Sequence, residues 1–220
     1  MNFFINNVRK MVRRCGFDVV HFNPLKPLLE KHQIDLVLDV GANEGQSYQL
    51  FRQAGYAGKI VSFDPNPKVF AGLERLGGRD WEKQRLALSS ASGEAEFFAT
   101  CETGWSGLHR NLSLPTVETF KVRTERLDRI WNWNASRAFL KIDTEGHDLE
   151  VVRGASGVMD KIRLIMVEAV LNPRYEGEPI HYQVVTAMHE FGFDVCKVQQ
   201  LYTDSAHGVD TGMDLIFSRR

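Results

Sequence analysis

Residues 36–45 read Leu-Val-Leu-Asp-Val-Gly-Ala-Asn-Glu-Gly, and this stretch decides the fold class. Its first five positions form a short apolar run interrupted only by Asp39, which predicts a strand buried on both faces. Gly41 and Gly45 follow directly, and residues 46–54 then have helical character. A strand that enters a helix through a glycine turn lets backbone N–H groups approach a ligand closely. The stretch therefore predicts a ligand site at the carboxyl end of a strand.

Short apolar runs and helical stretches alternate along the rest of the chain. Strands are predicted over residues 35–40, 59–64, 84–88, 138–143, 164–170, 193–198 and 213–217, with an added antiparallel strand over 93–98 and helices over 46–54, 68–76, 180–190 and through residue 152. Strands separated by helices of this length imply a mostly parallel sheet covered on both faces. We therefore expect an α/β, Rossmann-like fold with seven strands, the last of them antiparallel, in a single domain over residues 35–220.

The composition is that of a globular chain of 220 residues, with 43% hydrophobic and 25% charged residues. The 27 basic and 28 acidic residues almost cancel, which does not favour a nucleic-acid partner. No apolar run approaches the roughly 20 residues that a membrane-spanning helix needs. Three scattered cysteines fit no metal-ligand spacing, so we expect reduced thiols and a cytoplasmic location.

The first 14 residues combine apolar side chains at helical spacing with a cluster of arginine and lysine. This order of charge and apolar residues is not that of a signal peptide. We expect residues 1–34 to form a helical extension that packs on the domain or on a second copy of the chain, which would make a homo-oligomer. Contact of the basic helix with an anionic membrane surface is the alternative.

A second signal is Asp64, which ends the second predicted strand and can accept hydrogen bonds from two ribose hydroxyls. The glycine turn lacks the Gly-x-Gly-x-x-Gly pattern of dinucleotide sites, since Ala-Asn-Glu separates Gly41 from Gly45. These features favour a nucleoside cofactor with a small zwitterionic arm, S-adenosylmethionine. An NAD-dependent oxidoreductase is disfavoured on the same grounds.

The third signal is Lys-Ile-Asp-Thr-Glu-Gly-His-Asp over residues 141–148, at the end of the fourth predicted strand. Helix capping explains one or two of these acidic residues, because acidic groups favour the first turn of a helix. It does not explain a whole cluster of Asp143, Glu145 and His147. The cluster therefore indicates chemistry at the same edge of the sheet as the glycine turn.

The segments DVGANEGQ, SFDPNP, ALSSASGEAEFF, GWSGL, RTERLDRI, FLKIDTEGHDLEVVRGA and IMVEAV occur in this order over residues 36–198. In these segments the chain resembles the FkbM family of S-adenosylmethionine-dependent methyltransferases. The resemblance implies the class I methyltransferase fold and O-methylation of a sugar, glycan or natural-product hydroxyl. A phenolic or amine acceptor, or a module that binds S-adenosylmethionine without turnover, are the alternatives.

The resemblance also implies a cofactor site at the ends of four strands, made of Asp39, Gly41, Asn43, Gly45, Asp64, Asn66, Ala87, Ser89 and Asp143. The first four would surround the methionine arm and the sugar edge. Asp64 would hold the ribose hydroxyls, and Asn66, Ala87 and Ser89 would line the adenine wall. Asp143 would face the amino group and the reacting methyl.

The remaining expectations concern catalysis and the acceptor. His147 is a candidate base because its ordinary pKa is near neutrality, and Asp143 or Glu145 could orient it or replace it. With Glu168, these three residues could instead form a Mg²⁺ or Mn²⁺ site, an alternative that is not favoured. The acceptor is expected to be a small molecule or glycan contacting Trp105, Ser106, Glu168 and Tyr175, with His109 in the same irregular loop over residues 100–119. A polar loop is expected over residues 203–211.

Overall fold

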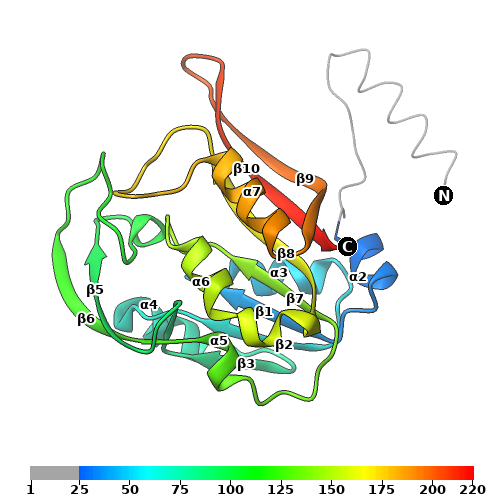
Figure 1. The fold of residues 1–220 in the computed structure, drawn as a ribbon. Coiled ribbons are helices and arrows are strands. Elements are labelled where there is room, and N and C mark those ends of the chain that lie inside the picture. Colours follow the sequence, from blue (N-terminus) through cyan, green and yellow to red (C-terminus); the bar gives the residue numbers. More distant parts are fainter. Residues whose placement is uncertain (1–24) are drawn as a thin grey trace, which may run out of the picture.

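The computed structural model describes residues 25–220, which are built around one seven-stranded sheet (Figure 1). Its strand order is β3-β2-β1-β7-β8-β10-β9. The strands are β1 (Leu36–Val40), β2 (Lys59–Phe63), β3 (Trp81–Gln84), β7 (Ala138–Ile142), β8 (Ile162–Val170), β9 (Phe193–Asp204) and β10 (Val209–Arg219). β10 runs antiparallel to both neighbours, and the other neighbouring pairs are parallel. The expected α/β sheet with an antiparallel last strand is confirmed.

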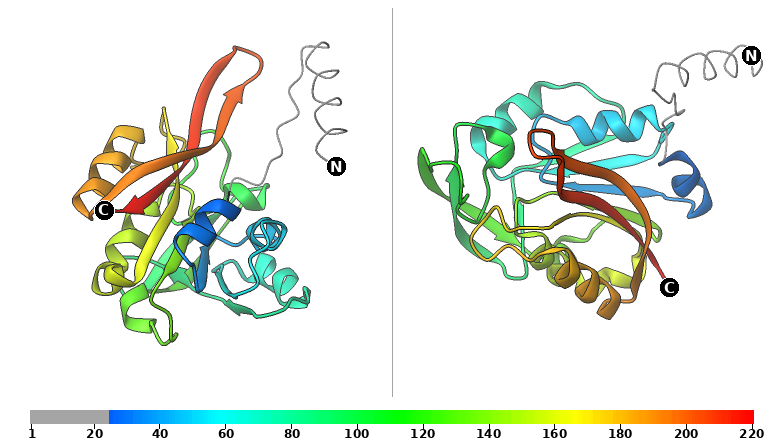
Figure 2. Two further views of the ribbon diagram at one scale, coloured as in Figure 1. Left: turned by 90° about the vertical axis from the view of Figure 1, so that its right-hand side faces the viewer. Right: turned by 90° about the horizontal axis from the view of Figure 1, so that it is seen from above.

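Helices cover both faces of this sheet (Figure 2). They are α2 (Lys26–Lys31), α3 (Gln46–Gln53), α4 (Pro67–Arg75), α5 (Leu127–Ile130), α6 (Asp148–Gly154) and α7 (His181–Glu190). Leu36 and Leu38 of β1 pack in the cluster that includes residues of α6 and α7, whereas Val37 packs with Phe51 of α3 on the opposite face. Burial on both faces explains why the sequence of β1 is apolar at every position except Asp39.

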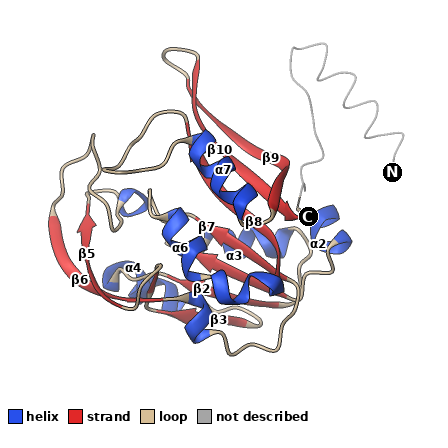
Figure 3. Cartoon of the chain, viewed as in Figure 1, coloured by secondary structure: helices blue, strands red, loops and turns tan. Residues whose placement is uncertain are grey.

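A second, three-stranded sheet lies beside the first (Figure 3). It contains β4 (Ala87–Leu88), β5 (Gly93–Ala99) and β6 (Glu118–Glu125) in the order β4-β6-β5. The single strand predicted over residues 84–88 is therefore wrong. β3 ends at Gln84, and residues 87–88 pair with β6 instead, so the predicted strand spans parts of two sheets. The short 3₁₀ helices η1 (Thr103–Trp105) and η2 (Ser156–Lys161) complete the elements.

The polar loop predicted over residues 203–211 is shortened to a turn over residues 205–208, because both of its ends are paired strand. β9 and β10 form a long hairpin that projects from the sheet (Figure 1), with Val209 paired to Asp204. Thr203 Oγ1 donates a 2.7 Å hydrogen bond to Asp210 Oδ1 across the two strands. Cross-strand pairing thus extends the strands through residues whose polarity had indicated a loop.

The helix expected within residues 1–14 lies outside the described residues. The described chain begins at Leu25, which is fully buried, and Leu29 of α2 packs with it against Phe51 and Ile216. Within residues 25–220, no helix is both long enough and apolar enough to span a bilayer.

Candidate active site

The glycine turn after β1 lies directly against the end of β7. Gly41 has a φ of +78°, and its N–H donates a 3.0 Å hydrogen bond to the carbonyl of Phe63. A Cβ placed on Gly41 would lie 1.8 Å from the carbonyl oxygen of Asp143. Gly45, with a φ of +85°, then starts α3. Both glycines are therefore required by backbone geometry, and they bring the ends of β1, β2 and β7 together.

Asp64 is anchored at the end of β2 by two backbone donors. Its carboxylate accepts 2.9 Å hydrogen bonds from the N–H groups of Asn43 and Asn66. Burial raises the pKa of Asp64 to about 6, and the two donors oppose that rise. Each carboxylate oxygen keeps a lone pair for a further donor, such as a ribose hydroxyl. Asn66 in turn caps α4 by accepting a hydrogen bond from the N–H of Lys68.

Two adjoining cavities open at this edge of the sheet. Gly41, Asp64 and Asp143 line both of them. The narrow cavity, here called the slot, is also lined by Asn66, Val69, Ala87, Leu88, Phe97, Leu108 and His147. The wider cavity has a volume of about 280 Å³ and is also lined by Asn43, Gln46, Ser47, Gly104, Lys141 and Glu145. Thr103 and Ser106 of the irregular loop line both, so this loop forms part of the site as expected.

Some expected cofactor residues lie behind the cavity walls. Asp39 is fully buried, accepts a 2.9 Å hydrogen bond from Ser62 Oγ and lies 3.3 Å from Lys141 Nζ. Ser89 lies behind the slot wall and contacts His147, while Gly45 packs against Trp81. These residues shape the site from outside the cavities.

His147 lies in the wall of the slot. Its Nε2 is 3.0 Å from Ser89 Oγ, and its Nδ1 is 3.0 Å from His109 Nε2. Burial, together with the neighbouring His109, lowers the pKa of His147 to about 4. A neutral imidazole with both nitrogens engaged is poorly placed to take a proton from an acceptor.

Glu145 lines the wider cavity, and the hydroxyl of Tyr175 holds its carboxylate in place. It has a φ of +55°, and its carboxylate accepts a hydrogen bond from the hydroxyl of Tyr175. Burial, and then the negative charge of Asp143, raise the pKa of Glu145 well above its ordinary value. Tyr175 is fully buried, so the expected stacking of its ring on an acceptor is wrong. Its hydroxyl positions Glu145 instead.

The other expected acceptor residues form a group beside the wider cavity. Arg174 Nη2 is 2.5 Å from Glu168 Oε2, and its guanidinium carbon is 5.7 Å from the ring centre of Trp105. Burial raises the pKa of Glu168 to about 7. Ser106 Oγ accepts a 3.0 Å hydrogen bond from the N–H of Thr100, which orients the loop.

The alternative metal site is not assembled by this geometry. Glu168 pairs with Arg174 and Glu145 with Tyr175, whereas His147 contacts Ser89 and His109. Across residues 25–220, no group of three or more histidine, cysteine, aspartate or glutamate side chains is arranged to hold a metal ion.

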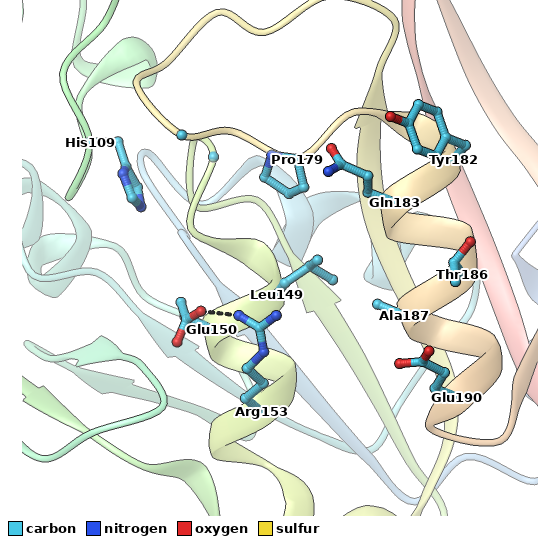
Figure 4. Close-up of a pocket in the computed structure, with 12 residues that line it drawn as sticks. His109, Leu149, Glu150, Arg153, Pro179, Tyr182, Gln183, Thr186, Ala187 and Glu190 are labelled. Carbon is cyan, nitrogen blue, oxygen red and sulfur yellow. Dashed lines mark hydrogen bonds and ion pairs between the residues drawn. The ribbon is translucent and has the colours of Figure 1, made fainter.

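A separate groove of about 420 Å³ lies between α6 and α7 (Figure 4). Arg153 and Glu150 form its α6 side, and Gln183 and Glu190 lie on its α7 side. The turn at Gly146 separates this groove from the two cavities of the site, because Glu145 faces the wider cavity and His147 faces the slot.

Sequence reasoning gave no role to Lys141, and it placed His109 beside the acceptor and not beside His147. Lys141 lines the wider cavity among carboxylates, and His109 fixes His147. A lysine inside the apolar run Ala-Phe-Leu-Lys-Ile-Asp over residues 138–143 was the available signal for Lys141, since a buried lysine requires partners. His109 carries no such signal, because the loop brings it to His147 only in the folded chain.

The fold is that of a class I methyltransferase. In the central sheet β10 lies antiparallel between β8 and β9, a glycine turn follows β1, and an acidic residue follows β2. The chain belongs to the FkbM family, since the model of the FkbM methyltransferase domain matches residues 39–195. This match confirms the resemblance to the FkbM family.

Two curated relatives are methyltransferases. The hexuronic acid methyltransferase AglP of Haloferax volcanii is 27% identical over 150 residues, which cover 66% of this chain and 60% of AglP. The 2-O-methyltransferase NoeI of Sinorhizobium fredii is 28% identical over 174 residues, covering 69% of each chain. Among solved structures, a Burkholderia thailandensis 1,6-didemethyltoxoflavin-N1-methyltransferase with bound S-adenosylhomocysteine has a TM-score of 0.47 at 13% identity, covering 90% of this chain and 77% of that one.

Proposed function

We propose that this protein transfers a methyl group from S-adenosylmethionine to a hydroxyl of a sugar or glycan. The observation that carries the proposal is the meeting of Gly41, Asp64 and Asp143, from the ends of three adjacent strands, around two adjoining cavities. When bound, S-adenosylmethionine supplies a methyl group made electrophilic by its sulfonium. Carboxylates around the cavities suit a cofactor that carries positive charge on its sulfonium and amino groups.

Each part of the cofactor has candidate partners in this chain. Asp64 would accept hydrogen bonds from the ribose hydroxyls, and Asp143 would receive the amino group. The slot, with its apolar side chains and the imidazole of His147, would hold the adenine ring. Asn43 lines the wider cavity, and its buried Oδ1 has no hydrogen-bond partner among the described residues, so it is available to a donor of the methionine arm.

Glu145 is the residue that we assign as general base. Its carboxylate lines the wider cavity together with Asp143, and its raised pKa brings it closer to the working pH than an ordinary carboxylate. The role of His147 is reassigned from base to slot wall. When Glu145 accepts the proton of the acceptor hydroxyl, the hydroxyl oxygen becomes a nucleophile. The walls of the wider cavity position this oxygen for in-line attack on the methyl group of the cofactor.

A sugar or glycan acceptor is supported by the two relatives. One is named for hexuronic acid and the other for a 2-O position. The balanced net charge of the chain supports a small molecule or glycan over nucleic acid. Trp105, 38% exposed, and Ser106 lie in the loop above the site, where an acceptor ring could contact them. The exposed free thiols of Cys101 and Cys196 support a reducing compartment such as the cytoplasm.

The test is the transfer of isotopically labelled methyl from S-adenosylmethionine to a panel of hexuronic acids, neutral sugars, simple phenols and amines. Label on a sugar hydroxyl, lost in the Glu145→Gln variant, is the expected result. Label confined to phenols or amines would replace the acceptor class. Binding of S-adenosylhomocysteine without transfer to any compound in the panel would favour the non-catalytic module.

A further inference from the structure

Lys141 lies among carboxylates at the carboxyl end of β7. Its side chain is 7% exposed, and its Nζ is 3.3 Å from both Asp39 Oδ1 and Asp143 Oδ2. The third neighbour is the carbonyl oxygen of Gly41, at 3.2 Å. The ammonium donates a hydrogen bond to the Gly41 carbonyl and is ion-paired with both carboxylates. Lys141 lines the wider cavity, so these contacts set the position of a positive charge beside the ligand site.

A continuous row of polar contacts leads from β3 to Lys141. Asp39 of β1 is the register partner of Ser62 on β2 and of Lys141 on β7, so the three residues are neighbours across the sheet. Ser62 Oγ donates to Asp39 Oδ2 at 2.9 Å and accepts from Trp81 Nε1 at 2.9 Å. The indole of Trp81 is itself fixed by stacking on Tyr48, with ring centres 3.8 Å apart.

The row ends at Asp143, whose carboxylate lies at the proposed ligand site. Asp39 is fully buried, whereas the Asp143 side chain is 45% exposed and lines both cavities. Burial alone would lower the pKa of Lys141, but the charges of Asp143 and Asp39 outweigh it, so the pKa is raised and the ammonium stays charged. A buried cation held between two carboxylates has a fixed position, because any movement leaves a carboxylate without its partner.

We propose that Lys141 is a positioning residue. It fixes the Asp143 carboxylate in the place where this carboxylate receives the amino group of the cofactor, and the row Trp81–Ser62–Asp39 holds Lys141 itself. This inference rests on the proposed function. It assigns to Lys141 a role that acts through the Asp143 carboxylate. Six acidic residues interact electrostatically with Lys141 or Asp143: Asp39, Asp64, Glu145, Asp148, Glu168 and Asp214.

The test is calorimetric titration of S-adenosylhomocysteine into the wild type and the Lys141→Met and Lys141→Arg variants at pH 7. Without the lysine, the Asp143 carboxylate loses the charged partner that holds it in place, so affinity should fall on the order of tenfold or more. Lys141→Arg keeps the charge and should retain more affinity at pH 7 than Lys141→Met.

The matched control is Lys121→Met, which removes an exposed lysine paired with Glu94 on the small sheet and should bind like the wild type. If Lys141→Met does not fold, Ser62→Ala decides, because it removes a donor to Asp39 without changing the charge. Ser62→Ala should weaken binding roughly fivefold.

The outcomes separate the inference from the proposed function. A wild type that does not bind S-adenosylhomocysteine contradicts the proposed function. A wild type that binds, with Lys141→Met binding equally well at pH 7, overturns the positioning role. Lys141→Arg binding as weakly as Lys141→Met also overturns it, because the positioning role predicts rescue by a retained positive charge.

Discussion

The backbone carbonyl oxygen of Asp143 lies 1.8 Å from the position that a Cβ on Gly41 would occupy. The two residues come from the ends of neighbouring strands, β1 and β7, and Asp143 N–H donates a 3.0 Å hydrogen bond to the carbonyl of Val40. This close approach brings the glycine turn and the Asp143 carboxylate to the same two cavities.

Gly41→Ala should therefore damage both stability and binding. The φ of +78° disfavours any Cβ, and the carbonyl of Asp143 would have to move. We expect a loss of roughly 2–5 kcal/mol in the free energy of unfolding, measured by urea denaturation. Gly72→Ala is the control, because Gly72 lies in α4 with open space around it, and it should stabilise the protein by about 0.5–1 kcal/mol. Equal effects of the two substitutions would refute the close-approach argument.

Asp64 should make cofactor binding depend on pH. Because burial raises its pKa to about 6, the carboxylate is protonated below that pH and accepts hydrogen bonds less well. Affinity for S-adenosylhomocysteine should therefore fall as the pH drops from 7 to 5. Asp64→Asn should bind about 10- to 100-fold more weakly at pH 7 and lose most of this pH dependence. Exposed Asp160→Asn should behave like the wild type, and an unchanged pH dependence in Asp64→Asn would contradict the assignment.

His147 should affect cofactor binding more than the chemical step. Its ring lines the slot, and removing it in His147→Ala enlarges the space for the adenine. We expect a raised KM for S-adenosylmethionine with kcat little changed at saturating cofactor. Steady-state kinetics check this, since loss of a general base would instead lower kcat by about 10²–10⁴-fold.

Glu145 and Tyr175 should act together in the chemical step. Glu145→Gln should lower kcat by about 10²–10⁴-fold while leaving affinity for S-adenosylhomocysteine unchanged. Because the pKa of Glu145 is raised, kcat should increase with pH as this carboxyl loses its proton. The Tyr175 hydroxyl opposes the rise in pKa, so Tyr175→Phe should move the acidic limb of the kcat profile to higher pH. A limb that does not move would separate Tyr175 from the base.

The residues that were expected to meet at one edge of the sheet, and that line both cavities, each follow a buried apolar strand. Gly41, Asp64 and Asp143 directly succeed β1, β2 and β7, and parallel strands of one sheet end at the same edge. Their meeting was predictable because strand direction follows from the alternation of strands and helices.

The features that sequence reasoning missed or assigned differently depend on geometry that exists only in the folded chain. His147 follows Glu145 by two positions, yet positive φ angles at Glu145 and Gly146 turn the imidazole into the slot. The role of Lys141 depends on its register with Asp39, which exists only once the strand order is known. β6 was not predicted because its sequence, Glu-Thr-Phe-Lys-Val-Arg-Thr-Glu, is mostly polar and half exposed.

The most direct measurement of the central claim is a crystal structure of this protein with S-adenosylhomocysteine. The account predicts the ribose hydroxyls on Asp64, the adenine in the slot beside His147, and the sulfur in the wider cavity between Asp143 and Glu145. Binding in the groove between α6 and α7, or a ribose away from Asp64, would contradict it.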